Sequence, residues 1–188
     1  MQGIKFNAQG IKAITEGRKT MTRRPIKDNG NAFRILETFD SSREYSIGAL
    51  INEYSKYKIG ETVFVQEEFY FDDEDYGLPL YYSLDDAKLK IQEYEGYSCI
   101  CDENCVYNAD QMQEHQSRIF LKITDTKVER LQDISSHDCK AEGVEFQTHK
   151  FRYRELFEKE IWNNLPYKAP HDWKSNPYVF VYEFEVVK

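Results

Sequence analysis

The sequence predicts an α+β domain whose core is a closed or nearly closed β-sheet. Strand-like segments stand towards both ends of the chain, the helical segments are short with one exception, and aromatic residues make up 15% of the composition. Aromatic and β-branched side chains favour strands, and a sheet flanked by short helices buries the apolar face of each. With 188 residues, 40% of them hydrophobic, the chain is long enough for one domain with a sizeable core.

A short helix is expected near the N-terminus, beginning after Asn7. Asn7 is a favoured N-cap residue, and apolar side chains recur at helical spacing over residues 8–14. Gly17 is placed to end this helix, because glycine adopts the left-handed backbone that commonly follows a last helical turn.

Residues 19–25 are predicted to form a strand. Their β-branched threonines favour an extended backbone, and Pro25 disfavours helix at the residue before it. Successive side chains of a strand face opposite sides. This alternation predicts one face with Lys19, Met21 and Arg23 and another with Thr20, Thr22 and Arg24.

Further strands are predicted at 62–69, at 118–128 and at 178–187, where apolar, β-branched and aromatic residues gather or alternate with polar ones. Two helices are expected between the last two strands. The first lies between Ser135, its N-cap, and Gly143, and the second is an amphipathic helix at 150–164.

The segment 70–116 is interpreted as an acidic insertion in a single domain that spans residues 1–188, with a short helix near 84–94. Residues 60–110 carry fourteen acidic and two basic side chains, whereas residues 1–34 carry eight basic and two acidic ones. Together with a net charge of −8, this excludes broad, non-specific nucleic-acid binding and suits a basic pocket for a small anionic ligand or a short strand. The alternative is a solubilising surface with one basic patch.

The sequence predicts a cytoplasmic protein. No stretch approaches 18 apolar residues, and the N-terminus lacks the apolar region of a secretory signal. No cofactor is expected. Cys99, Cys101 and Cys105, with His115 ten residues further on, contain ligand types that zinc prefers, but they lack the usual paired knuckles. Reduced thiols on a loop are the alternative interpretation.

Four strings stand in order along the chain. The first is GRKTMTRR at 17–24, with a G-x-K-x-x-x-x-R pattern, and the second is KIGETVFVQE at 58–67. The third runs from SRI at 117–119 through VERLQDI to AEGV at 141–144, and the fourth joins Trp173 to NPYVFV at 176–181. Together they resemble the ASCH domain of the PUA-like superfamily, in particular the longer ASCH-like proteins of bacteriophages and prophages.

This resemblance implies a small PUA-like β-barrel flanked by short helices, with a cleft for a nucleotide, a nucleoside or a short RNA. One branch of the family hydrolyses the acyl amide of N4-acetylcytidine, and another class is associated with RNA cleavage. The chain departs from the second string of the family at two positions, where Glu61 stands for Asp and Gln66 for Arg.

Carried over by motif position, the catalytic residues of the hydrolase branch fall on Lys19, Thr22 and Glu142. Thr22 would attack the amide, Lys19 would take its proton, and Glu142 would hold the Lys19 amine or protonate the leaving amine. The alternatives are a structural ion pair between Lys19 and Glu142, and a threonine chosen for its strand propensity.

Residues expected to bind the ligand are Arg23, Arg24, Glu67, Arg118 and Trp173. Arginine forks bind phosphate or carbonyl oxygens, and tryptophan stacks on bases. The alternatives are a solvated pair for the two adjacent arginines, an acidic neighbour for Arg118, and a core-sealing turn for Trp173.

Three functions remain open from the sequence. The first is a binding module for RNA or a nucleotide, and the second is a hydrolase of a modified nucleoside or of RNA. The third is a non-catalytic phage protein that binds a host partner related to nucleic acid, with the acidic insertion as its interaction surface.

Overall fold

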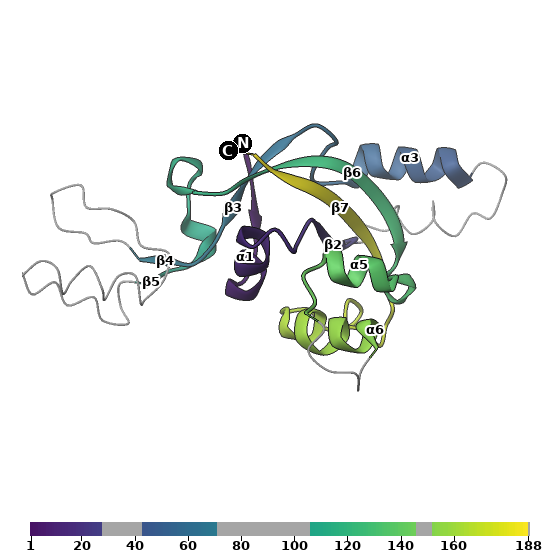
Figure 1. Cartoon of the computed structure of the whole chain (residues 1–188). Helices are drawn as coiled ribbons and strands as arrows, with labels where there is room; N and C mark the ends of the chain where they lie inside the picture. The colour runs from purple at the N-terminus through teal and green to yellow at the C-terminus, as the bar shows by residue number, and fades with distance from the viewer. Residues whose placement is uncertain (28–42, 71–105, 146–151, 188) are drawn as a thin grey trace, which may run out of the picture. The chain divides into compact units, whose positions relative to one another are not determined.

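The computed structural model describes residues 1–27, 43–70, 106–145 and 152–187. These residues form a mixed α+β structure around a five-stranded sheet with the order β1-β3-β6-β7-β2 (Figure 1). The strands are β1 (Gln2–Lys5), β2 (Met21–Pro25), β3 (Thr62–Gln66), β6 (Phe120–Arg130) and β7 (Tyr178–Val187).

The sheet is not closed into the barrel that the sequence predicts. Closure needs a hydrogen-bonded ladder between the two end strands, and among the described residues β1 pairs only with β3 and β2 only with β7. The strands divide between two compact units. Of the described residues, the first unit holds 1–12, 62–70, 106–121 and 187, and the second holds 13–27, 43–61, 122–145 and 152–186.

In the first unit, β1 runs parallel to β3, with Gln2 opposite Val63 and Lys5 opposite Gln66. Ile4, Val63 and Val65 are buried there. The short strands β4 (Phe69–Tyr70) and β5 (Val106–Tyr107) form an antiparallel pair, followed by the 3-10 turns η2 (Ala109–Gln111) and η3 (Glu114–Gln116). The strand expected at 62–69 is therefore two strands.

In the second unit, β2 pairs antiparallel with β7, with Met21 opposite Glu183 and Pro25 opposite Val179. Its helices are α3 (Arg43–Tyr54), α5 (Ser136–Ala141) and α6 (Tyr153–Leu156). α6 continues into a π turn, η5 (Phe157–Ile161), and a 3-10 turn, η6 (Trp162–Asn164), so one helical stretch changes its winding. The second unit has an apolar core to which α5, α6, η5 and η6 contribute together with β2 and β7, made of Met21, Leu131, Ile134, Cys139, Val144, Leu156, Phe157, Trp162, Val179 and Val181.

Two predicted helix starts are confirmed. α1 (Ala8–Thr15) begins after Asn7, whose Oδ1 accepts a hydrogen bond from the backbone N–H of Gly10 at 2.9 Å. α5 begins after Ser135, whose Oγ accepts from the backbone N–H of Asp138 at 3.1 Å. Each side chain thus satisfies a backbone donor that has no partner within its helix.

The last strand, 178–187, is confirmed with its predicted bounds, and the strand predicted at 118–128 is found at 120–130. The helix predicted at 150–164 is confirmed over its described part, residues 153–164. The helix near 84–94, most of the acidic insertion and the three cysteines considered for zinc lie outside the described residues. In the described part of the chain, no helix is long and apolar enough to cross a membrane.

Candidate functional site

Lys19 and Glu142 meet in the interior of the second unit. Their backbones form an isolated antiparallel bridge, and Lys19 Nζ donates to the carbonyl oxygen of Glu142 at 2.9 Å and to Glu142 Oε2 at 2.5 Å. The side chains are 5% and 2% exposed. Two residues 123 positions apart are therefore held in a buried ion pair.

The backbone on both sides fixes this contact. Gly17, at φ 71°, ends α1, and the backbone N–H of Lys19 then donates to the carbonyl of Ala13 at 3.0 Å. Glu142 is the C-cap of α5, and Gly143 after it has φ 92°, in the region that favours glycine. Arg18 Nη1 donates to the Gly143 carbonyl at 2.9 Å, which ties the two turns together.

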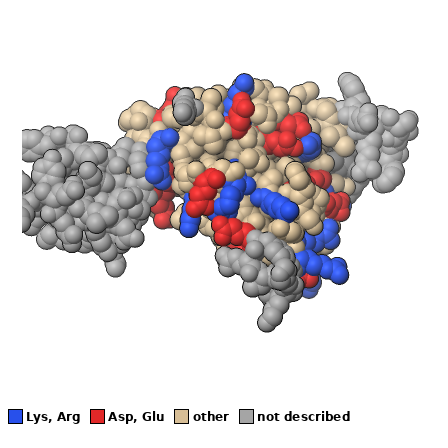
Figure 2. All heavy atoms as spheres, viewed as in Figure 1, with Lys and Arg blue, Asp and Glu red and all other residues tan. Residues whose placement is uncertain are grey.

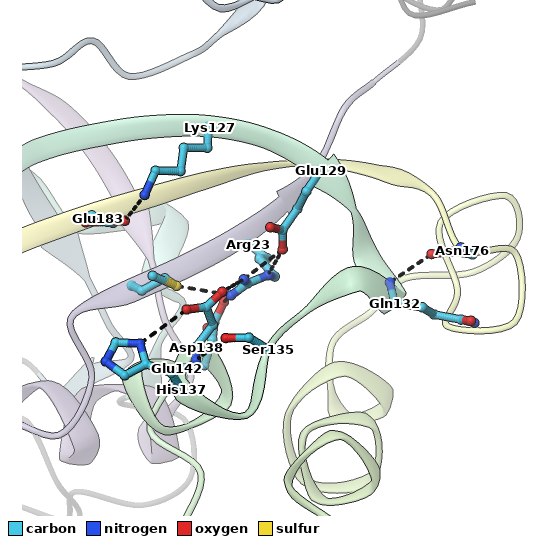
Figure 3. A network of polar contacts seen from close by, with 11 residues as sticks. Arg23, Lys127, Glu129, Gln132, Ser135, His137, Asp138, Glu142, Asn176 and Glu183 are labelled. Atoms are coloured by element: carbon cyan, nitrogen blue, oxygen red, sulfur yellow. Dashed lines mark hydrogen bonds and ion pairs between the residues drawn. The ribbon is translucent and has the colours of Figure 1, made fainter.

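Arg23 contacts Glu142 and joins it to two further carboxylates (Figure 3). Its guanidinium is 1% exposed and donates to Glu142 Oε1 at 3.1 Å, to Glu129 Oε1 at 2.8 Å and to Asp138 Oδ2 at 3.0 Å. Glu129 comes from β6 and Asp138 from α5, and both are 25% exposed. We call Lys19, Arg23, Glu129, Asp138 and Glu142 the charged cluster.

The charged cluster holds three carboxylates and two cations inside the unit. Taking ions out of water is costly, and the cost is offset only where charges are paired and hydrogen-bonded. Arg23 meets this requirement because its planar fork bonds several carboxylate oxygens at once. Burial lowers the pKa of the Lys19 ammonium, and Glu142 only partly offsets this.

The pKa values of Glu129 and Asp138, which both bind Arg23, are shifted in opposite directions. Burial raises the pKa of Glu129, although Arg23 opposes the shift. Burial also acts to raise the pKa of Asp138, but hydrogen bonds from His137, Ser135 and Arg23 together with the charge of Arg23 outweigh it, so that this pKa is lowered. Burial raises the pKa of the neighbouring Cys139 thiol to about 11, so that it is a neutral thiol near pH 7.

Thr22 is not brought to the Lys19–Glu142 pair. Arg23 Nη1 contacts Met21 Sδ at 3.2 Å, so residues 21 and 23 share a face of β2, and Thr22 between them faces the other side. Thr22 is 5% exposed, and its neighbour across the sheet is Tyr182. The side-chain alternation predicted for this strand is the geometry found, and the nucleophilic role of Thr22 stays a prediction.

The expected ligand-binding residues are spread over the structure. Arg24 is half-buried on the face of Thr22. Glu67 and Arg118 lie in the first unit, where Arg118 donates to both carboxylate oxygens of Glu67, at 2.9 and 2.8 Å. Trp173 packs against the apolar core of the second unit, with its ring centre 6.0 Å from that of Phe157.

Glu129 and Asp138 belong to the charged cluster but are absent from the sequence prediction. Asp138 follows Ser135 by three positions, where a local pattern indicates a capping contact and no role in a site. The signal that could have found both carboxylates is Arg23 itself, because an arginine on a buried strand face requires acidic partners. Which acidic residues would supply them depends on how β6 and α5 pack against β2, and local sequence does not contain that information.

No protein-family model matches the chain, and neither a curated protein nor a solved structure matches it. Within the described residues, no group of three His, Cys, Asp or Glu side chains is arranged to hold a metal ion. On the face shown in Figure 2, basic and acidic side chains of the described residues are interspersed. The candidate site therefore rests on the geometry of the charged cluster.

Proposed function

We propose that this protein is an ASCH-type, PUA-like domain that binds a nucleoside, a nucleotide or a short RNA at the Lys19–Glu142 pair. One observation carries the proposal. The resemblance assigns Lys19 and Glu142 to a shared site, and these side chains lie 2.5 Å apart although 123 residues separate them in the chain. Two residues that act in one site must lie close together. This proximity in space is not encoded in the local sequence strings on which the resemblance rests.

The pair suits the edge of a nucleobase. An ammonium group donates hydrogen bonds and a carboxylate accepts them, so adjacent Lys and Glu side chains match an edge that carries an acceptor atom beside an N–H donor, as N3 and the 4-amino group of cytosine do. Single-stranded RNA and free nucleosides expose such edges, whereas a duplex hides them. Arg24 lies within electrostatic range of Lys19 and adds positive charge for a phosphate.

Hydrolysis of an amide on a modified base is the second candidate, and the environment of Lys19 favours it. Burial lowers the pKa of this amine, which increases its ability to accept a proton near neutral pH. The Glu142 carboxylate lies within proton-transfer distance of Nζ. In this reaction N4-acetylcytidine and water would give cytidine and acetate.

The test measures binding and turnover separately. Cytidine monophosphate and a short oligocytidine RNA are titrated into the protein by calorimetry, and cytidine release from N4-acetylcytidine is followed by chromatography. Lys19→Met and Glu142→Gln are compared with Lys127→Met and Glu183→Gln. Lys127 and Glu183 also lie 2.5 Å apart, but they are exposed and lie outside the charged cluster.

We expect wild-type protein to bind one of the probes, and both charged-cluster variants to lose at least tenfold in affinity. The exposed-pair variants should bind like wild type. Turnover that disappears in the same two variants would establish the hydrolase. Absence of binding and turnover with all three probes would overturn the proposal, as would equal losses in the exposed-pair variants.

A further inference from the structure

Arg23 was expected to contact the ligand, and its geometry indicates a different role. Its side chain is 1% exposed, and each of its three nitrogens donates to a carboxylate from a different place in the chain. Arg23 Nη1 also contacts Met21 Sδ at 3.2 Å, on the same face of β2. These contacts engage the guanidinium within the protein, so that little of it faces outward.

The two oxygens of Glu142 are divided between two cations. Oε1 accepts from Arg23 Nη1 at 3.1 Å, and Oε2 accepts from Lys19 Nζ at 2.5 Å. With one cation at each oxygen, the two contacts fix the plane of the carboxylate, so that one oxygen is always directed at Lys19 Nζ. Arg23 is itself prevented from turning, because Glu129 and Asp138 hold its Nε and Nη2.

We propose that Arg23 is a positioning residue, which holds Glu142 Oε1 so that Oε2 stays directed at the Lys19 amine. The inference rests on the proposed function, because it gives Arg23 its purpose through the Lys19–Glu142 pair. Glu129 and Asp138 act one step further out by fixing the guanidinium. Glu142 is thus buried in contact with Lys19 and Arg23, and the two carboxylates that hold Arg23 are partly exposed.

One consequence distinguishes this role from general support of the fold. Burial is the main cause of the lowered pKa of the Lys19 ammonium, and the positive charge of Arg23 adds to it. Replacing Arg23 by a neutral residue should therefore raise that pKa. A residue that only stabilised the packing would leave the pKa of Lys19 unchanged in molecules that remain folded.

The experiment follows the pKa of Lys19 by NMR on protein labelled with ¹³C at lysine Cε, with Lys19→Met to assign the signal. Arg23→Gln removes both the positive charge and the planar guanidinium, whereas Arg23→Lys keeps a positive charge without the guanidinium. Asp138→Asn keeps Arg23 but removes one of its anchors, and serves if Arg23→Gln fails to fold. Arg130→Gln is the matched control, because Arg130 stacks on Tyr178 and lies outside the charged cluster.

We expect an upward shift of the Lys19 pKa in Arg23→Gln, a smaller one in Arg23→Lys, and none in Arg130→Gln. Asp138→Asn should broaden or split the Lys19 signal as the guanidinium gains freedom. An unchanged Lys19 pKa and signal in folded Arg23 and Asp138 variants would overturn the proposal. Because no ligand is needed, a failure of the proposed function in binding assays is recognised separately.

Discussion

Gly143 packs so closely on Ala13 that a Cβ added at position 143 would lie 2.8 Å from the Ala13 Cβ and 3.4 Å from the Lys19 Cβ. The residue also has φ 92°. The turn that follows Glu142 therefore combines a backbone conformation that glycine adopts freely with a contact that only glycine allows. Both features place the carboxylate of Glu142 against Lys19.

Gly143→Ala should lower the free energy of unfolding by about 3 kcal/mol, from left-handed strain of about 1–2 kcal/mol and from overpacking. Gly60→Ala is the matched control, since Gly60 has φ 84° but an added Cβ would meet no atom within 4 Å. Gly60→Ala should lose only the part of the unfolding free energy that comes from left-handed backbone strain. Urea unfolding of both variants measures the difference, and equal losses would show that the contact with Ala13 has no energetic weight.

The ion pair of Lys19 and Glu142 should have a larger coupling energy than an exposed pair. Removing one partner leaves a buried charge, so Lys19→Met should cost about 3 kcal/mol. A double-mutant cycle with Glu142→Gln is expected to give a coupling of about 1–3 kcal/mol. The same cycle at Lys127 and Glu183, which are 57% and 34% exposed, should give at most about 1 kcal/mol. Equal couplings in urea unfolding would contradict the burial argument.

Asp138 and Glu129 should affect acid stability with opposite signs. The pKa of Asp138 is lowered in the folded protein, so its contribution is present above the ordinary carboxylate range and is lost as the pH falls through the folded pKa. Asp138→Asn should therefore flatten the loss of stability in acid.

The pKa of Glu129 is raised, so the folded state binds its proton first and gains stability relative to the unfolded state as the pH falls towards the ordinary carboxylate range. Glu129→Gln should remove that gain, so that the unfolding free energy falls more steeply as the pH is lowered. The measurement is the unfolding free energy from pH 7 to pH 3. Parallel curves for the two variants would contradict the assigned shifts.

Arg118→Gln should destabilise the protein and leave ligand binding intact. The change removes both hydrogen bonds to Glu67, whose side chain is 6% exposed, and the cost of leaving this charge unpaired is about 2 kcal/mol. The double variant Arg118→Gln/Glu67→Gln should recover part of the loss. Titration of the nucleotide probes checks the second claim, and weakened binding in folded Arg118→Gln would restore Arg118 as a ligand-binding residue.

Thr126→Val should stabilise the protein by about 1 kcal/mol, because an unbonded buried hydroxyl carries a desolvation cost that a methyl group does not. Within the described structure, the Thr126 Oγ1 atom is buried without a hydrogen-bond partner, and the residue is 5% exposed. Thr126→Ser keeps the hydroxyl and should bring no gain. A loss of stability in Thr126→Val would indicate that a bound water completes this site.

Local patterns were sufficient for the elements that local interactions build. Asn7 and Ser135 were recognised as N-caps because a side-chain oxygen a few residues from an unpaired N–H forms its hydrogen bond within one turn. α3 was missed, because Gly48 interrupts its sequence and few apolar residues mark a buried face. The prediction of one strand at 62–69 was wrong as well, because the polar residues Gln66, Glu67 and Glu68 separate Val65 from Phe69 and the chain leaves the ladder there.

The sequence by itself determined the α+β class, the helix starts, the last strand and the alternation that separates Lys19 and Arg23 from Thr22. These follow from interactions within a few residues. Only the tertiary structure decided that the sheet stays open, that Arg23 is enclosed by three carboxylates, and that Arg118 is paired with Glu67. The physical reason is that a buried charge must find its partners across the fold, and those partners are selected by packing between distant segments.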